Sequence, residues 1–243
     1  DDMAGRHNQS TQFVRGLRFY DVFLTTKTYN VFELQKLGCP DVRYIGNGYD
    51  PATFRPVAVS ADDERRLGGE IGFIGSYEQA RSEMLYLLAS SGLNIRVWGG
   101  GWHRAVRSHP NLRIEKQPLY GDDFAKACAA FKINLGFLRK LNRDLQTTRS
   151  VEIPACGGFM LAERTCEHAE LFAEGEEAEF FDSPEELLAK CRFYLAHEEV
   201  RRRIAERGYE RCLRSDYSNA GRLAIVFPYL LARLEHKVTR VLS

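Results

Sequence analysis

The stretch RSVEIPACGGFMLAE, residues 149–163, places a glutamate, Glu152, directly before a turn of small residues. An apolar run, 159–162, follows the turn, and this order predicts a helix packed closely onto a strand. A carboxylate in that position needs a partner, because an unpaired buried charge is costly. Either a nearby Arg or Lys supplies the partner, or a ligand does.

A second candidate group follows the predicted strand 70–75. Gly75 allows close backbone approach, the helix that starts at Ser76 offers free N–H groups to an anion, and Arg81 is within reach of a phosphate. The alternative is a tight strand–helix turn with a surface arginine. The pattern G-x-G-x-x-G is absent, so the sequence carries no dinucleotide-binding fingerprint.

Two loops add further candidates. The sequence WGGGWHR, residues 98–104, indicates either a ligand-facing loop or a mobile turn with aromatic cover. His103 lies in it, but a lone histidine is more often structural. The loop after strand 132–137 is crowded with polar side chains, which either line a ligand site or are solvated. They are Arg139, Lys140, Asn142, Arg143, Asp144 and Arg149.

Alternating strands and helices must position these residues. Apolar runs predict strands at 20–26, 42–48, 70–75, 94–101, 111–117, 132–137, 158–163 and 178–183. Helical patterns cover 9–19, 29–37, 76–92, 121–131, the stretch around Glu152 and about 184–236, whereas 50–69 has the composition of a linker. Such alternation predicts an α/β fold with a doubly wound parallel sheet. Ligands bind such sheets beyond the carboxyl ends of the strands.

Composition excludes several classes of protein. The chain has 243 residues, 44% hydrophobic and 28% charged, with a net charge of +1, which favours no nucleic-acid or membrane surface. None of the six cysteines forms a C-x-x-C pair, and reduced core cysteines are the simplest interpretation. The sequence shows no membrane span and no signal peptide, so we expect a cytoplasmic protein. Because it begins with Asp1, we expect that an upstream part has been removed.

Four segments resemble GT-B glycosyltransferases of the group 1 type, and within them the CgeB-like proteins named after spore maturation. IGNGYDPATFRP (45–56) is similar to the passage between the two Rossmann domains, and IGFIGSYEQAR (71–81) to the phosphate turn. INLGF (133–137) is similar to the strand before the donor loop. RSVEIPACGGFML (149–161) resembles the family signature, with Val151 where Phe is common.

The resemblance implies a role for each residue of the site. The two-acid motif falls on Asp144 and Glu152, with the shorter Asp in place of the first Glu, and Glu152 would hold the ribose hydroxyls of a nucleotide sugar. Gly75, Ser76 and Arg81 would bind the diphosphate. Asp144 and its neighbours, Arg149 included, would face the donor sugar. Gln117, Leu119 and Tyr120 would flank the base. No nucleophile or general base is assigned.

The resemblance also implies an organisation and a reaction. Residues 1–56 would be the end of an acceptor-side Rossmann domain, 57–216 the donor domain, and 217–243 a helix that returns to the first domain. We expect transfer of a sugar from a nucleotide sugar to an unknown acceptor without a metal ion or cofactor. A second domain or a second copy would cover apolar surface at the two ends. The alternatives are a sugar-nucleotide epimerase and a non-catalytic nucleotide-sugar-binding module.

Overall fold

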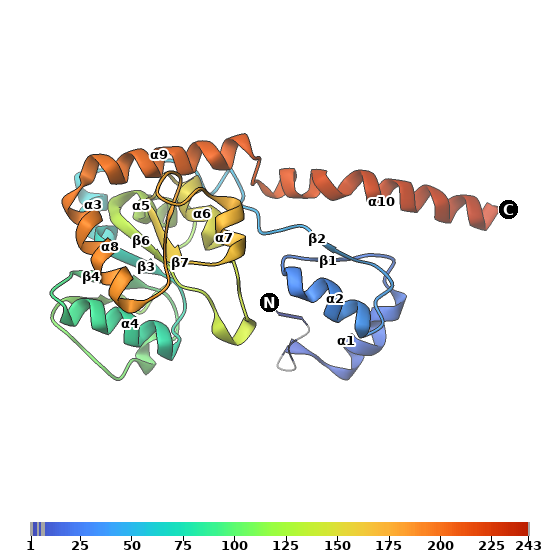
Figure 1. The fold of residues 1–243 in the computed structure, drawn as a ribbon, viewed down its shortest axis with the longest axis horizontal. Coiled ribbons are helices and arrows are strands. Elements are labelled where there is room, and N and C mark those ends of the chain that lie inside the picture. The colour runs from blue at the N-terminus through green and yellow to red at the C-terminus, as the bar shows by residue number, and fades with distance from the viewer. Residues whose placement is uncertain (1, 4, 6–7, 243) are drawn as a thin grey trace.

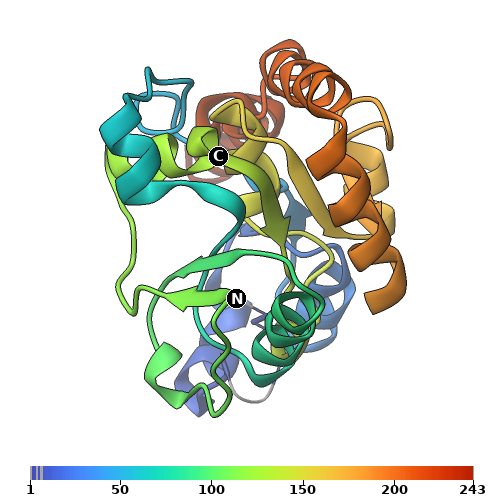
Figure 2. The same cartoon turned by 90° about the vertical axis from the view of Figure 1, so that its left-hand side faces the viewer.

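The computed structural model describes residues 2–3, 5 and 8–242, and it shows a large α/β unit beside a small N-terminal unit (Figure 1). A long C-terminal helix, α10 (Asn219–Leu242), projects from the α/β unit along the N-terminal one. Its Tyr229 donates a hydrogen bond to Asp41, and the Arg233 guanidinium lies 3.6 Å from the same carboxylate. The α/β unit faces the viewer in Figure 2.

Six parallel strands form the sheet of the α/β unit, in the order β5-β4-β3-β6-β7-β8. They are β3 (Gly69–Ile74), β4 (Ile95–Trp98), β5 (Leu112–Ile114), β6 (Phe131–Gly136), β7 (Met160–Glu163) and β8 (Glu179–Phe181). Counted from β3, this is the 3-2-1-4-5-6 order of a doubly wound sheet. The predicted fold class is therefore confirmed.

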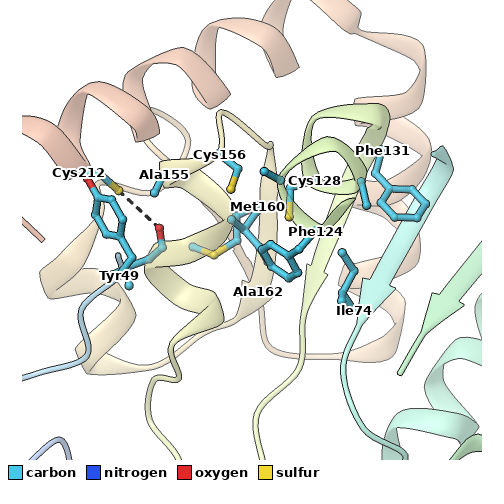
Figure 3. Packing of buried hydrophobic residues seen from close by; sticks show 14 of the residues in the cluster. Tyr49, Ile74, Phe124, Cys128, Phe131, Ala155, Cys156, Met160, Ala162 and Cys212 are labelled. Carbon is cyan, nitrogen blue, oxygen red and sulfur yellow. Dashed lines mark hydrogen bonds between the residues drawn. The ribbon is translucent and has the colours of Figure 1, made fainter. Parts of the chain in front are cut away.

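Helices cover both faces of the sheet, which explains why its strands are apolar almost throughout. They are α3 (Ala61–Leu67), α4 (Gln79–Ser90), α5 (Gly121–Ala130), α6 (Arg149–Ala155), α7 (Cys166–Leu171), α8 (Pro184–Ala196) and α9 (Glu198–Arg214). Neighbouring strand residues separate into two clusters: Met160 packs with α5 and α6, whereas Leu161 packs with α4 and α8. Figure 3 shows the first cluster, in which Cys128 and Cys156 lie close to Phe124 and Met160.

The N-terminal unit has its own small core. It consists of α1 (Thr11–Gly16), β1 (Phe23–Thr25), α2 (Thr28–Lys36) and β2 (Val42–Tyr44), with a short 3-10 turn, η2 (Leu17–Phe19), after α1. Strands β1 and β2 pair in parallel, and Leu17, Leu34, Cys39 and Val42 are buried between the elements. The helix predicted over 9–19 is thus a short helix followed by a tighter turn.

One prediction about the elements needs correction. Segment 50–69 is not only a linker, because its second half forms α3. Ser60 caps that helix by accepting a hydrogen bond from the Asp63 N–H, while the Asp63 carboxylate accepts one from the Ser60 N–H. The stretch 184–236 is helical as predicted, and the helices within it are α8, α9 and the start of α10.

The cysteines behave as their surroundings predict. All six are free thiols, and five of them are buried. Burial raises the pKa of the Cys128 thiol well above its ordinary value, and the neighbouring Cys156 adds to the rise. Such thiols are inert core residues. Over the part of the chain that the structure describes, no helix is both long and apolar enough to cross a membrane.

Candidate functional site

The carboxyl ends of β3 and β6 lie side by side at the point where the strand order reverses. From β3 the chain continues to β4 and β5 on one side, and from β6 to β7 and β8 on the other. Connections leaving in opposite directions open a crevice, and this is where doubly wound sheets bind ligands.

The turn after β3 is tied to the ends of β4 and β5. The Gly75 N–H donates to the Trp98 carbonyl at 2.9 Å, and the Gly99 N–H donates to the Gln117 carbonyl at 2.8 Å. The Trp102 indole N–H donates to the Gly75 carbonyl at 2.8 Å. Any Cβ at Gly99 would lie 2.0 Å from that same carbonyl oxygen, so only glycine fits. The turn is therefore held in place, and Ser76 is exposed at its tip.

Both tryptophans of the WGGGWHR stretch are buried. Trp102 packs edge-on against Phe73 and Tyr77, and the Trp98 indole N–H donates to the Leu67 carbonyl at 3.3 Å. The two aromatic rings thus support the glycine turn from within the protein. His103 is exposed.

Arg81 bridges the two strand ends at the switch point. Its guanidinium donates to the Ser76 carbonyl at 3.0 Å and to the Phe137 carbonyl at 3.2 Å. Arg81 is 7% exposed, and burial lowers the pKa of its guanidinium. Its Nε is buried and has no hydrogen-bond partner in the part of the chain that the structure describes. The side chain is not the surface arginine of the simpler interpretation, and it starts in the first turn of α4.

A hollow of about 330 Å³ lies beside Arg81. It is lined by residues from the ends of β6, β7 and β8, among them Phe137, Leu138, Glu163 and Arg164. A larger hollow of about 900 Å³ lies near Gly69, Phe131 and Gly158, at the amino ends of the strands. We assign the candidate site to the carboxyl edge, because sheets of this topology bind ligands there.

Glu152 is buried on α6, and its partner in the structure is Arg149, whose guanidinium donates to the carboxylate. Arg149 also donates to the Ile74 carbonyl at 3.3 Å and lies 4.2 Å from the centre of the Phe124 ring. One arginine thus connects the end of β3, helix α5 and the carboxylate. The sequence left open two kinds of partner for Glu152, a nearby cation or a ligand, and in the structure the partner is a cation. Ribose binding by this residue stays a prediction.

The small-residue turn after Glu152 serves close packing. A Cβ at Gly158 would lie 2.9 Å from both the Asn134 amide nitrogen and the Cys128 carbonyl oxygen. The glycine lets the chain enter β7 directly beneath α6 and beside β6. This explains the sequence that follows the glutamate, whatever ligand the site holds.

The three residues assigned to the base lie between β5 and α5, at the same edge of the sheet. Gln117 and Tyr120 are exposed, and Tyr120 immediately precedes α5. Leu119 is buried in the cluster that contains Phe124. The structure thus buries Leu119 in the core and leaves the other two side chains exposed.

Asp144 lies in the loop after β6 but faces the N-terminal unit. Its carboxylate is 2.6 Å from the Lys27 ammonium, and both side chains are almost fully buried. Sequence reasoning missed Lys27, and no local pattern could reveal it, because the partners are separated by more than 100 positions. A second missed pair is Ser150 with His168, whose Nε2 lies 2.7 Å from the hydroxyl.

The Ser150–His168 pair resembles a nucleophile and its base only in distance. The imidazole Nδ1 lies 2.6 Å from the Glu163 carbonyl oxygen, and burial lowers the pKa of His168 below its ordinary value. Both residues are nearly inaccessible, at 3% and 1% exposure. The pair therefore fixes the start of α6 against the loop after β7. Within the described residues, no group of three metal-ligating side chains comes together.

Three comparisons bear on identity. Residues 80–227 match a family described as glycosyl transferase-like. Sucrose-phosphate synthase from Thermosynechococcus elongatus superimposes with a TM-score of 0.66 at 14% identity, covering 95% of this chain and 66% of that one. Anabaena Alr3699/HepE in complex with UDP-glucose gives 0.68 at 14% identity, covering 95% and 70%. A comparison with curated proteins finds no match.

A third solved structure matches a smaller share of this chain, but the match extends over the full length of that structure. The C-terminal domain of a glycosyl transferase group 1 family protein, LpcC, from Francisella tularensis gives a TM-score of 0.53 at 15% identity, covering 71% of this chain and 100% of that one. The chain spans about two thirds of the length of the first two structures. At such identities the likeness shows the fold, that of GT-B glycosyltransferases. The family match covers well over half of the sequence, and this chain belongs to the glycosyl transferase-like family.

Proposed function

We propose that this chain carries the donor site of a glycosyltransferase that moves a sugar from a nucleotide sugar to an acceptor. Within the family, we place it among the CgeB-like proteins of the group 1 type. The family match and the GT-B fold support a transferase. The HepE structures, described as complexes with UDP and with UDP-glucose, make uridine nucleotides the first donors to test.

The observation that carries this proposal is the position of Arg81. It is a buried cation between the carboxyl ends of β3 and β6, with one N–H group still without a partner. A desolvated guanidinium beside a tight glycine turn suits a diphosphate, since charge-assisted hydrogen bonds are stronger away from water.

Glycosyl transfer needs such a group where charge develops. As the bond between the sugar and the diphosphate breaks, negative charge grows on the leaving phosphate oxygens. Fixed donors at that position lower the barrier without reorganising. Arg81, the Ser76 N–H and the first backbone N–H groups of α4 would supply these donors, since the Gly75 and Tyr77 N–H groups already bond to carbonyls. We therefore propose a reaction without a divalent metal ion or cofactor.

Glu152 would then hold the ribose, because a carboxylate accepts hydrogen bonds from both hydroxyls of a vicinal diol. Since Arg149 already bonds this carboxylate, the ligand must share or displace that contact. Gln117, Leu119 and Tyr120 would flank the base at the next turn along the edge.

We further propose the division into 1–56, 57–216 and 217–243, with the first and last parts belonging to an acceptor-side domain of a cytoplasmic enzyme. The division agrees with the separate apolar core of the N-terminal unit and with α10 lying along it.

One experiment separates transferase from the alternatives. The purified chain is incubated with labelled UDP-, GDP-, dTDP- and ADP-sugars, with and without sugar-bearing acceptors. Transfer supports the proposed function, an epimerised donor indicates the epimerase, and binding without turnover indicates a nucleotide-sugar-binding module. Absence of binding by all four donor classes would refute the donor site.

A further inference from the structure

The loop between β6 and α6, residues 137–148, joins two parts of the candidate site. It begins at Phe137, whose carbonyl accepts a hydrogen bond from Arg81, and it ends at the start of α6, which carries Arg149 and Glu152. The two ends of the loop are fixed at these parts, so a shift of its middle, which carries Asp144, would change what the loop presents between them. What holds the loop in place is a question about the site as well as about the fold.

The N-terminal unit holds the loop through buried polar contacts. Lys27 forms the ion pair with Asp144 and also donates to the Gln146 carbonyl at 3.1 Å. The Tyr29 hydroxyl donates to the Asn142 carbonyl. Burial raises the pKa of the Tyr29 phenol, and the nearby Asp2 and Asp144 carboxylates add to the rise, so the hydroxyl stays a donor.

Arg143 completes the contact in the opposite direction. Its guanidinium reaches out of the loop and makes two parallel hydrogen bonds of 2.8 Å to the Glu33 carboxylate, and its Nε donates to Asp2 at 2.7 Å. It also lies 4.5 Å from the centre of the Tyr29 ring. Forked arginine–carboxylate pairs fix orientation as well as distance. The loop presents this arginine with a left-handed backbone, φ +52°.

These contacts connect units whose apolar cores are separate. Among the described residues, the cluster around Leu17 and Leu34 does not merge with the two clusters of the sheet. A junction built from charge pairs is more easily rearranged than a shared apolar core. At the same time, removing one partner of a buried pair is costly, because the other charge is left uncompensated.

We propose that Lys27 is a positioning residue of the donor site. Its ion pair with Asp144 fastens the loop 137–148 to the N-terminal unit, and we call this contact the lock. The lock thereby determines the position of the loop relative to the donor sugar. Asp144 acts through this lock and does not touch the reacting atoms, since its buried carboxylate is already bonded to an ammonium. The part that concerns the sugar rests on the proposed function.

The first test measures the lock without any ligand. Hydrogen exchange of the amides of residues 139–148 is compared in the wild type, Lys27→Met and Lys27→Arg. The matched control is Lys36→Met, which changes an exposed lysine at the end of α2, the helix that Lys27 immediately precedes. We expect exchange about tenfold faster or more in Lys27→Met, with protection largely restored in Lys27→Arg and unchanged in Lys36→Met. Unchanged exchange in folded Lys27→Met would overturn the lock.

The second test asks whether the lock serves the sugar. Calorimetry gives the affinities for UDP and for UDP-glucose in the wild type, Lys27→Met, Asp144→Asn and the double variant. We expect UDP-glucose affinity to fall by about tenfold in each single variant, with UDP affinity nearly unchanged, because in this proposal the middle of the loop faces the sugar and not the nucleotide. The double variant should be no weaker than the weaker single variant.

The outcomes separate this inference from the proposed function. If the wild type binds neither UDP nor UDP-glucose, the uridine donor is wrong, and the exchange experiment still decides whether the lock exists. If Asp144→Asn weakens UDP-glucose binding and Lys27→Met does not, Asp144 contacts the sugar directly and the positioning role fails. Equal losses for UDP and UDP-glucose would also refute it, since the effect would not be specific to the sugar.

Discussion

The substitution Glu152→Gln tests whether the Glu152 carboxylate binds the ribose hydroxyls or only pairs with Arg149. The variant keeps the shape of the side chain but replaces a charged acceptor pair with one oxygen and an NH₂ donor. If the ribose hydroxyls donate to Glu152, the variant loses charge-assisted hydrogen bonds, each worth about 1.5–3 kcal/mol. Nucleotide-sugar affinity should then fall by about tenfold to hundredfold.

The structure sets a separate expectation for stability. The Arg149 side chain is 35% exposed, so water can solvate its guanidinium when the charge on residue 152 is removed. The cost should resemble that of a partly exposed ion pair, about 1 kcal/mol. For a chain of this size, that corresponds to a melting temperature about 2–4 °C lower. A small drop in stability is therefore expected under both interpretations and does not discriminate between them.

The discriminating assay is the ratio of affinities for UDP and its 2′-deoxy analogue, measured by calorimetry on both proteins. Wild type should prefer the ribonucleotide, and Glu152→Gln should lose most of that preference. Arg149→Gln serves as the matched control, because it breaks the same ion pair and leaves the carboxylate free for the diol. If Glu152→Gln leaves the ratio unchanged, Glu152 is a structural partner of Arg149 and the ribose assignment is refuted.

Three further predictions follow from other parts of the structure. Arg81→Met should weaken UDP binding by about tenfold to hundredfold and uridine binding far less, and equal losses by calorimetry would remove Arg81 from the phosphate site. Burial lowers the pKa of His168, so its contribution to stability is full above about pH 6.5 and is lost as pH falls. The free energy of unfolding should thus change with pH between 7 and 5 less steeply in His168→Gln than in wild type, whereas an equal slope in both would refute this. Phe227 and Leu231 on α10 are 56% and 46% exposed, and we expect a second domain or copy to cover them. Sedimentation should show either concentration-dependent association of the chain or binding of an added acceptor-side domain. Phe227→Glu should reduce whichever of the two occurs. A chain that stays monomeric and binds no such domain would contradict the expectation.

Local sequence patterns were sufficient for most of the fold. Each of the eight predicted strands is present, because each is a short apolar run bounded by turn residues. Ser183 and Pro184 start α8 as their cap pattern predicts. Helix α3 was missed because its capping box uses Asp63 in place of the usual Glu, inside a segment that proline and charge made resemble a linker. Here the capping hydrogen bonds decide the structure, and composition does not reveal them.

The site was predictable only where it depends on a turn next to a strand. Gly75 and Arg81 lie together at the switch point because the order of the strands puts them there. By contrast, Lys27 and Asp144 belong to different units of the fold and are paired by a tertiary contact. The sequence around either residue contains no pattern that predicts the other. Pairings of this kind depend on tertiary contacts between distant segments, which periodicity and spacing do not encode.

The polar groups of the candidate site differ in how ready they are for a ligand. Glu152 accepts a hydrogen bond from Arg149, and Asp144 is ion-paired with Lys27, so an anionic ligand is repelled and a neutral one must share an existing contact at either carboxylate. Arg81 is held by two backbone carbonyls and lies 3.9 Å from the Glu78 carboxylate, and among the described residues its buried Nε–H has no hydrogen-bond partner. A ligand oxygen that reaches this nitrogen therefore satisfies a donor that the protein leaves unsatisfied, and it need not displace either carbonyl. It follows that the diphosphate should contribute most of the affinity and the ribose should tune it. UDP should accordingly bind much more tightly than uridine.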